Sequence, residues 1–177
     1  MKSNWPPTPT WGGTSATPWK WPISFREFRL SWIEEPLMPH EVESHAELKR
    51  RCPWQRWSCG EHSYTKWDFK LLLNRRAVDI LQPDANQTGG ITEMIKICAL
   101  AEAAGLPVMP HSNETHNTHV VFSRAAHVCP RIEYFPDVEP DTGNELFGSY
   151  IAVCRKRTRA GCKRPTSLAW ASPSMKR

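Results

Sequence analysis

The sequence predicts an α/β fold made of repeated β/α units, arranged as part of a (β/α)8-type barrel. Short apolar segments alternate with amphipathic ones, and parallel neighbouring strands need a return helix between them. Each apolar segment leads to an ionisable residue, and such a residue recurs about every 25 positions, which is the period of this barrel. The residues are Glu34, Glu61, Asp84, His111 and Glu133. Strand ends carry the chemistry in that fold, so these are the candidate functional positions.

Five strands are expected, each from a run of apolar or β-branched residues. They are FRLSWIEEP at 28–36, RWSCGE at 56–61, VDILQP at 78–83, LPVMPH at 106–111 and RIEYFP at 131–136. The segments between them have the spacing of helices buried on one face and span 40–51, 64–77, 89–105 and 117–127. Five strands leave two open edges, which favours association. The chain is therefore expected to be either an open doubly wound sheet or a piece of a larger barrel.

Charge is unevenly distributed along the chain of 177 residues, whose net charge is +5. Residues 1–22 and 149–177 contain ten of the 23 basic residues and none of the 18 acids, so the core between them carries −5 (13 basic against 18 acidic). A nucleic-acid surface on the core is not expected. The six cysteines have no metal-site spacing and are interpreted as reduced thiols, and no apolar run resembles a signal peptide or a membrane span. We expect a cytoplasmic protein.

The two ends differ in character from the core. Residues 1–22 are rich in Pro, Thr, Gly and Trp, and residues 149–177 are basic without periodicity. The codons that can encode PWKWP also permit a helix-forming sequence when they are read in a shifted frame. The codons that can encode LAWASPSMK likewise permit G-L-G-V-T-I-D-E in a shifted frame. The hypothesis is that residues 1–22 (the head) and 149–177 (the tail) were translated in the wrong reading frame, whereas the core at 23–148 was translated in the correct one. The alternative is that both ends are native disordered tails.

Five motifs resemble one known family. They are WIEEP at 32–36, GEH at 60–62, DILQPD at 79–84, TGGITE at 88–93 and PVMPH at 107–111. In this order and spacing they are similar to the mandelate racemase and muconate-lactonising enzymes of the enolase superfamily, especially to acid-sugar dehydratases of the rhamnonate dehydratase type. The resemblance covers Ile23 to Phe147. It implies strands four to eight of a (β/α)7β barrel, without the N-terminal capping domain and the first three strands.

The resemblance also implies a chemistry. Glu34 and Glu61 match two of three acids that hold Mg2+ in the family, while the third is expected near Thr8, in a head that contains no Asp or Glu. Asp84 and His111 match an Asp–His dyad in which the histidine abstracts the proton α to a carboxylate and helps to expel water. Substrate contacts are expected from Glu133 and His62. The implied activity is that of a Mg2+-dependent acid-sugar dehydratase, a lyase acting on aldonates, whose full-length relatives form homo-oligomers. This chain alone is expected to be inactive.

Several alternatives stay open. The reaction can be a racemisation or another reaction of the superfamily, or the chain can be a non-catalytic interaction fragment of pseudogene type. A glycosidase also places two carboxylates at strand ends, but it needs no metal. Taken singly, Glu35 and Pro36 can end a strand at a turn beside Glu34, Asp84 can cap a helix, and His111 can be a loop histidine.

Two further motifs favour ordinary structure. Gly89–Gly90 lacks a phosphate-loop pattern and predicts a tight turn before a helix. His111, Glu114, His116 and His119 lack the HExxH spacing of a zinc site, and the last two histidines are expected at the start of a helix.

Overall fold

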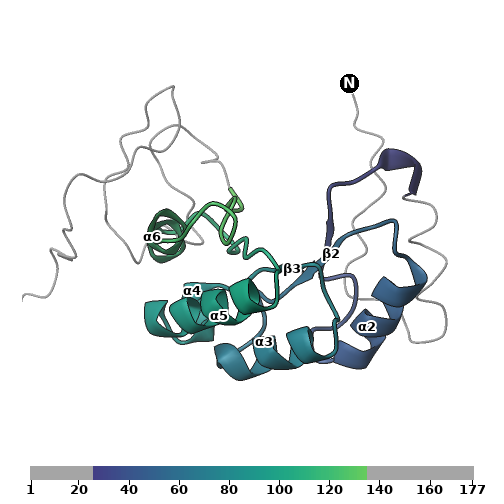
Figure 1. Ribbon diagram of the computed structural model, residues 1–177, viewed down its shortest axis with the longest axis horizontal. Helices are drawn as coiled ribbons and strands as arrows, with labels where there is room; N and C mark the ends of the chain where they lie inside the picture. The colour runs from purple at the N-terminus through teal and green to yellow at the C-terminus, as the bar shows by residue number, and fades with distance from the viewer. Residues whose placement is uncertain (1–25, 135–177) are drawn as a thin grey trace, which may run out of the picture.

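The computed structural model describes residues 26–134, so the predicted head at 1–22 and tail at 149–177 lie outside the described residues. The described chain alternates short strands with helices (Figure 1). The strands are β1 (Ile33–Glu34), β2 (Trp57–Cys59) and β3 (Ile80–Leu81). The helices are the 3-10 turn η1 (Arg26–Phe28), α2 (Val42–Arg51), α3 (Thr65–Asn74), α4 (Ala85–Thr88), α5 (Ile91–Ala103) and α6 (Thr115–Ser123).

The three strands form one parallel sheet in the order β1-β2-β3. Ile33 pairs with Trp57 and Glu34 with Ser58, while Cys59 pairs with Leu81. Because all the strands run the same way, their carboxyl ends meet at one edge of the sheet. The β/α alternation expected from the sequence is confirmed, and the four predicted helices correspond to α2, α3, α5 and α6.

The strands are shorter than the sequence predicts. The segment expected at 28–36 forms regular pairing only at β1, and the one at 106–111 appears as a single parallel bridge between Leu81 and Val108. Pro107 and Pro110 explain the second case, because proline has no N–H to donate to a sheet. In the described part of the expected strand at 131–136, Glu133 N–H donates to the carbonyl of Pro110 at 3.2 Å without forming a regular strand.

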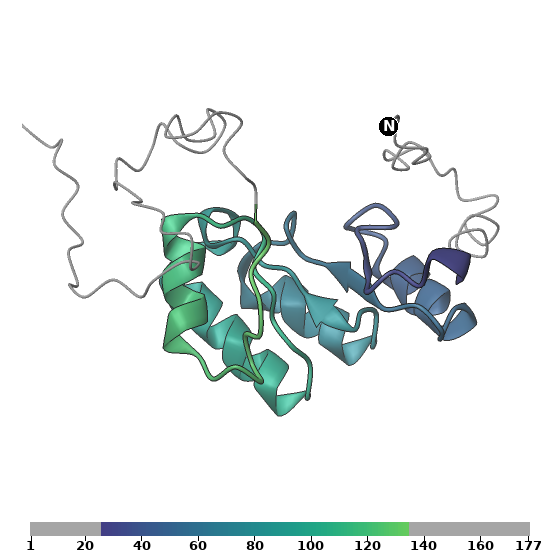
Figure 2. The same ribbon diagram turned by 90° about the horizontal axis from the view of Figure 1, so that it is seen from above.

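The helices follow one another in an arc around the strands, with α2, α3 and α5 in sequence and α6 beside α5 (Figures 1 and 2). The larger core cluster lies where α3 and α5 pack on β2 and β3, and its fully buried side chains include Phe69, Met94 and Ile97. A smaller cluster joins Leu48 of α2 to Trp57 of β2. This arrangement is that of part of a β/α barrel, with parallel strands on the inside and helices packed on their outer face. The carboxyl ends of the strands are left available to carry polar groups. Within residues 26–134 no helix has the length and apolarity needed to cross a membrane.

Candidate functional site

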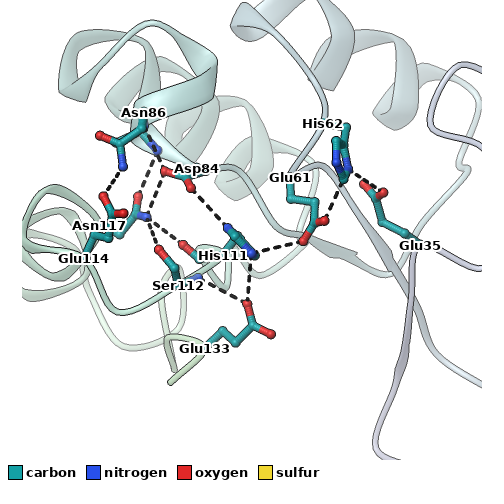
Figure 3. A network of polar contacts seen from close by, with 11 residues as sticks. Glu35, Glu61, His62, Asp84, Asn86, His111, Ser112, Glu114, Asn117 and Glu133 are labelled. Atoms are coloured by element: carbon teal, nitrogen blue, oxygen red, sulfur yellow. Dashed lines mark hydrogen bonds and ion pairs between the residues drawn. The ribbon is translucent and has the colours of Figure 1, made fainter. Parts of the chain in front are cut away.

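The polar side chains at the strand ends form one connected network (Figure 3). Glu34 ends β1, Glu61 follows β2, and Asp84 follows β3. His111 follows the bridging residue Val108. With Glu133 from the last described segment, all five ionisable residues predicted at strand ends lie at the same edge of the sheet, where parallel pairing brings them together.

Asp84 and His111 form a hydrogen-bonded pair. The distance from His111 Nδ1 to Asp84 Oδ2 is 3.1 Å, while Asp84 Oδ1 accepts from the backbone N–H of Asn86 at 2.9 Å and so caps α4. Burial acts to raise the pKa of Asp84, but the hydrogen bonds from His111, Asn86 and Asn117 outweigh burial and lower it. Asp84 is therefore ionised in the fold and holds the imidazole of His111 by its Nδ1.

The other ring nitrogen of His111 faces two more acids. Its Nε2 lies 3.3 Å from Glu61 Oε2 and 3.7 Å from Glu133 Oε2. Burial lowers the pKa of His111, but the Asp84 hydrogen bond and the charges of Glu61, Glu133 and Asp84 together raise it to about 9. An imidazole oriented by a carboxylate and made more basic by its neighbours is suited to proton transfer.

Glu34 is the most perturbed carboxyl group of the cluster. Burial raises its pKa to about 7, and the negative charges of Glu133 and Glu61 act in the same direction. Glu34 and Glu61 are close enough for a hydrogen bond between their side chains to contribute to this shift. The two acids predicted to hold a metal ion are thus neighbours whose negative charges repel each other. A divalent cation would relieve this repulsion, and carboxylate oxygens are the donors that Mg2+ prefers.

Two residues that contact the network were not anticipated from the sequence. Sequence patterns indicated only a turn role for Glu35, but its side chain is 8% exposed and its Oε2 lies 2.8 Å from Nδ1 of His62. Asn117 of α6 is fully buried, its Nδ2 donates to Asp84 Oδ1 at 3.1 Å and to the His111 carbonyl at 2.6 Å, and its Oδ1 accepts from Ala85 N–H at 2.9 Å. No local pattern marks either residue, because Asn117 meets Asp84 from 33 positions away.

His62, predicted to contact substrate, lies between the network and a cavity. Its Nδ1 is 3.3 Å from Glu61 Oε1, on the side opposite His111 in Figure 3. The cavity has a volume of about 510 Å³ and lies between the starts of α2 and α3. Its lining includes Met38, His40, His62, Tyr64 and Leu71.

Among residues 26–134, one group of three side chains has the spacing of metal ligands. Atoms of Glu35, Glu61 and His62 lie within 4.8 Å of one another. This group shares Glu61 with the pair Glu34–Glu61 expected from the sequence. Within the same described range, the zinc alternative at His111, Glu114, His116 and His119 does not form such a group, and His116 and His119 lie in the first two turns of α6, as predicted.

Comparisons with known proteins agree with this geometry. The sequence model of the family described as "Enolase C-terminal domain-like" matches residues 11–162. The chain is 44% identical over 109 residues to L-rhamnonate dehydratase of Saccharopolyspora erythraea, covering 61% of this chain and 27% of that enzyme.

Solved structures give the same result. L-talarate dehydratase from Polaromonas sp. JS666, complexed with Mg and L-glucarate, is 37% identical with a TM-score of 0.55, covering 64% of this chain and 30% of that one. A racemase from Streptomyces coelicolor A3(2) with bound magnesium is 28% identical with a TM-score of 0.56, covering 63% and 32%. The described chain is thus part of an enolase-type C-terminal barrel, and it spans about a quarter to a third of the length of these relatives.

Proposed function

The chain belongs to the enolase C-terminal domain-like family, and on this premise we propose that its strand-end residues are those of a Mg2+-dependent acid-sugar dehydratase. The reaction removes the proton α to a carboxylate and eliminates water from the neighbouring carbon. The observation that carries the proposal is the juxtaposition of a carboxylate-oriented imidazole, His111, with the acid pair Glu34 and Glu61.

The donor set fits magnesium. Glu34 and Glu61 are the proposed ligands, because they offer carboxylate oxygens and because the raised pKa of Glu34 reflects burial beside other negative charges. Bound there, Mg2+ would supply positive charge for the substrate carboxylate, whose negative charge grows as the α-proton leaves. The relatives complexed with magnesium support this choice.

The residues of this chain divide the remaining work. Asp84 holds Nδ1 of His111, so that the proton of the substrate passes to Nε2. The protonated ring can then return that proton to the departing β-hydroxyl group, which leaves as water. Glu133, 3.7 Å from the same Nε2, is placed to bind a substrate hydroxyl, and His62 is proposed to do so from the cavity side.

A second candidate is racemisation. It is favoured by the likeness to the Streptomyces coelicolor racemase. Both reactions begin with proton removal by His111, and they differ in the second step: a dehydratase loses the β-hydroxyl, whereas a racemase returns a proton to the opposite face of the α-carbon. The dehydratase stands first because the relative with 44% identity is a dehydratase.

A graft tests the proposal, because the chain spans 27% of that relative. The 109 aligned residues of this chain replace their counterparts in the L-rhamnonate dehydratase, and the graft is incubated with sugar acids and Mg2+. We expect formation of a 2-keto-3-deoxy acid, its loss in EDTA and its return with Mg2+. A His111→Asn graft is the matched control and should be inactive.

Three results would count against the dehydratase. Activity in the His111→Asn graft would show that His111 is not the base. Incorporation of deuterium at the α-carbon in D2O, without loss of water from the sugar acid, would indicate a racemase. A folded graft with neither activity excludes both functions for these residues. We expect this chain alone to show no turnover, since Glu34 and Glu61 are two of the three acids that the family resemblance requires.

A further inference from the structure

Gln82 is a buried amide that the proposed mechanism does not use. It follows β3 directly, is 1% exposed, and donates its backbone N–H to the carbonyl of Cys59 at 3.0 Å. Within residues 26–134, neither Nε2 nor Oε1 of its side chain makes a hydrogen bond. Buried polar groups are nearly always paired, because an unpaired one costs free energy. An amide that is buried without a partner, at the edge of a cluster of acids, is more typical of a functional site than of a core.

The strand register places Gln82 on the inner face of the sheet, away from the helices. Successive residues of a strand point to opposite faces. Leu81 belongs to the larger core cluster under α3 and α5, so Gln82 points away from these helices. On β1, Ile33 packs against the smaller cluster under α2, so Glu34 also points away from the helices. Gln82 and Glu34 therefore share the inner face, with β2 running between their strands.

The amide of Gln82 acts on the carboxyl group of Glu34. Burial raises the pKa of Glu34, the side chain of Gln82 lowers it, and the charges of Glu133 and Glu61 raise it further. The amide thus lies beside this carboxyl group, although its Nε2 is not in hydrogen-bonding geometry. Ionised acids only accept hydrogen bonds, whereas the amide has two N–H donors. Gln82 can therefore supply Glu34 with a hydrogen bond that its acidic neighbours cannot.

We propose that Gln82 is a positioning residue for Glu34: its Nε2 donates to one carboxylate oxygen and leaves the other oxygen to the cation. This role rests on the proposed function, because it requires Glu34 to be a magnesium ligand. Carboxylates that bind metal ions are held by hydrogen bonds from neighbouring groups, and loss of such a partner typically weakens metal binding about 10- to 100-fold. The burial of an amide at this position is then explained by the orientation that it gives to Glu34.

The experiment is a calorimetric titration of the full chain with Mg2+, in which the wild type is compared with Gln82→Met. Methionine has nearly the length of glutamine and no N–H donor. We expect Gln82→Met to bind Mg2+ about 10- to 100-fold more weakly than the wild type. Ser58→Ala is the matched control. Ser58 pairs with Glu34 in the sheet and is fully buried, but its hydroxyl donates to the carbonyl of Ile33 at 3.4 Å, so its loss should leave the Mg2+ affinity unchanged.

A second measurement separates positioning from a purely structural role. The Gln82 amide makes no hydrogen bond within the described chain, so Gln82→Met should unfold, without metal, at a urea concentration no lower than the wild type. A residue that only stabilises the fold would give the opposite pattern, with a lower urea midpoint and an unchanged Mg2+ affinity.

Four outcomes would overturn the proposal. Equal Mg2+ affinity of the wild type and Gln82→Met removes the role of Gln82 but leaves the metal pair Glu34–Glu61 intact. An equal loss of affinity in Ser58→Ala shows that the effect is not specific to the amide, and a lower urea midpoint of metal-free Gln82→Met assigns the amide to the fold. Absence of Mg2+ binding to the wild-type chain contradicts the metal pair itself. This last result counts against the proposed function, and it is therefore distinguishable from failure of the Gln82 role alone.

Discussion

Replacing Glu34 by glutamine should stabilise the metal-free chain at alkaline pH while removing a proposed magnesium ligand. Burial, with the charges of Glu133 and Glu61, raises the pKa of Glu34 from 4.5 to about 7. Between these values the folded chain binds more protons than the unfolded chain, so its stability falls as pH rises. Above about pH 7 the full cost of the buried charge is present.

The magnitude is set by the size of the pKa shift. One pKa unit corresponds to about 1.4 kcal/mol, so the shift of Glu34 from 4.5 to about 7 gives at most about 3.5 kcal/mol. Partial solvent screening reduces this cost to about 2 kcal/mol. Glutamine has nearly the same shape and no charge. We therefore expect Glu34→Gln to increase the free energy of unfolding by about 2 kcal/mol at about pH 8.5 and by almost nothing at about pH 4.5.

Urea denaturation at the two pH values is the assay, with an unchanged slope against urea showing that the unfolded state is comparable. Glu102→Gln is the matched control, because Glu102 lies on α5 with a side chain that is 56% exposed. Calorimetric titration should show Mg2+ binding to the wild-type chain and none to Glu34→Gln. Destabilisation of Glu34→Gln at the alkaline pH, or an equal gain at both pH values, would refute the assignment of a buried, uncompensated carboxylate.

Three other changes have defined outcomes. Gly60→Ala should destabilise the fold by about 2 kcal/mol by urea denaturation, because φ is +141° and a Cβ there would lie 2.7 Å from the Phe69 ring. His111→Asn should flatten the pH dependence of unfolding between pH 6.5 and about 9, since the raised pKa of His111 stabilises the fold below 6.5 and this contribution is lost as pH rises through about 9. Hydrogen peroxide, a two-electron oxidant, should join Cys98 and Cys129, whose sulfur atoms lie 3.8 Å apart, with a loss of two hydrogen atoms measured by mass spectrometry.

Each of these has a control. Gly105→Ala also has positive φ, +71°, but nothing lies near its added Cβ, so it should cost only about 1 kcal/mol. An equal loss for both glycine variants would argue against the ring contact. A wild-type stability curve that rises between pH 6.5 and about 9 would contradict the His111 pKa. A Cys129→Ser chain that loses the same mass would place the disulfide elsewhere.

The parts of the fold that the sequence predicts are those set by periodicity. Apolar spacing located α2, α3, α5 and α6, and an ionisable residue after each apolar run located the five residues that meet at the sheet edge. Both patterns are local, and the parallel topology converts a local pattern into a cluster. For this reason the position of Asp84 in the chain was enough to place it near His111.

The parts that the sequence did not predict depend on geometry without a local pattern. A strand neighbour of Glu34 is expected on the opposite face, and only the left-handed φ of Glu35 brings its carboxylate to His62. The α4 turn is too short for any periodicity. Asn117 is a polar residue on a helix, a position that usually faces water, but here it is fully buried and donates to Asp84.

Asp84 and Glu34, two carboxyl groups of the proposed site, have pKa values shifted in opposite directions, and this difference suits them to different roles. Asp84 is held ionised by His111, Asn86 and Asn117, so its charge is already used to orient the imidazole. Glu34 is buried beside other acids and holds its proton up to about pH 7, so its charge has no equivalent use within the network. Groups of one chemical type that are pushed apart in pKa take different roles. The charge of Asp84 is thus stabilised within the chain without a ligand, whereas ionising Glu34 costs free energy that a bound divalent cation would offset. This difference supports the assignment of Glu34 as a metal ligand and of Asp84 as the residue that orients the base His111.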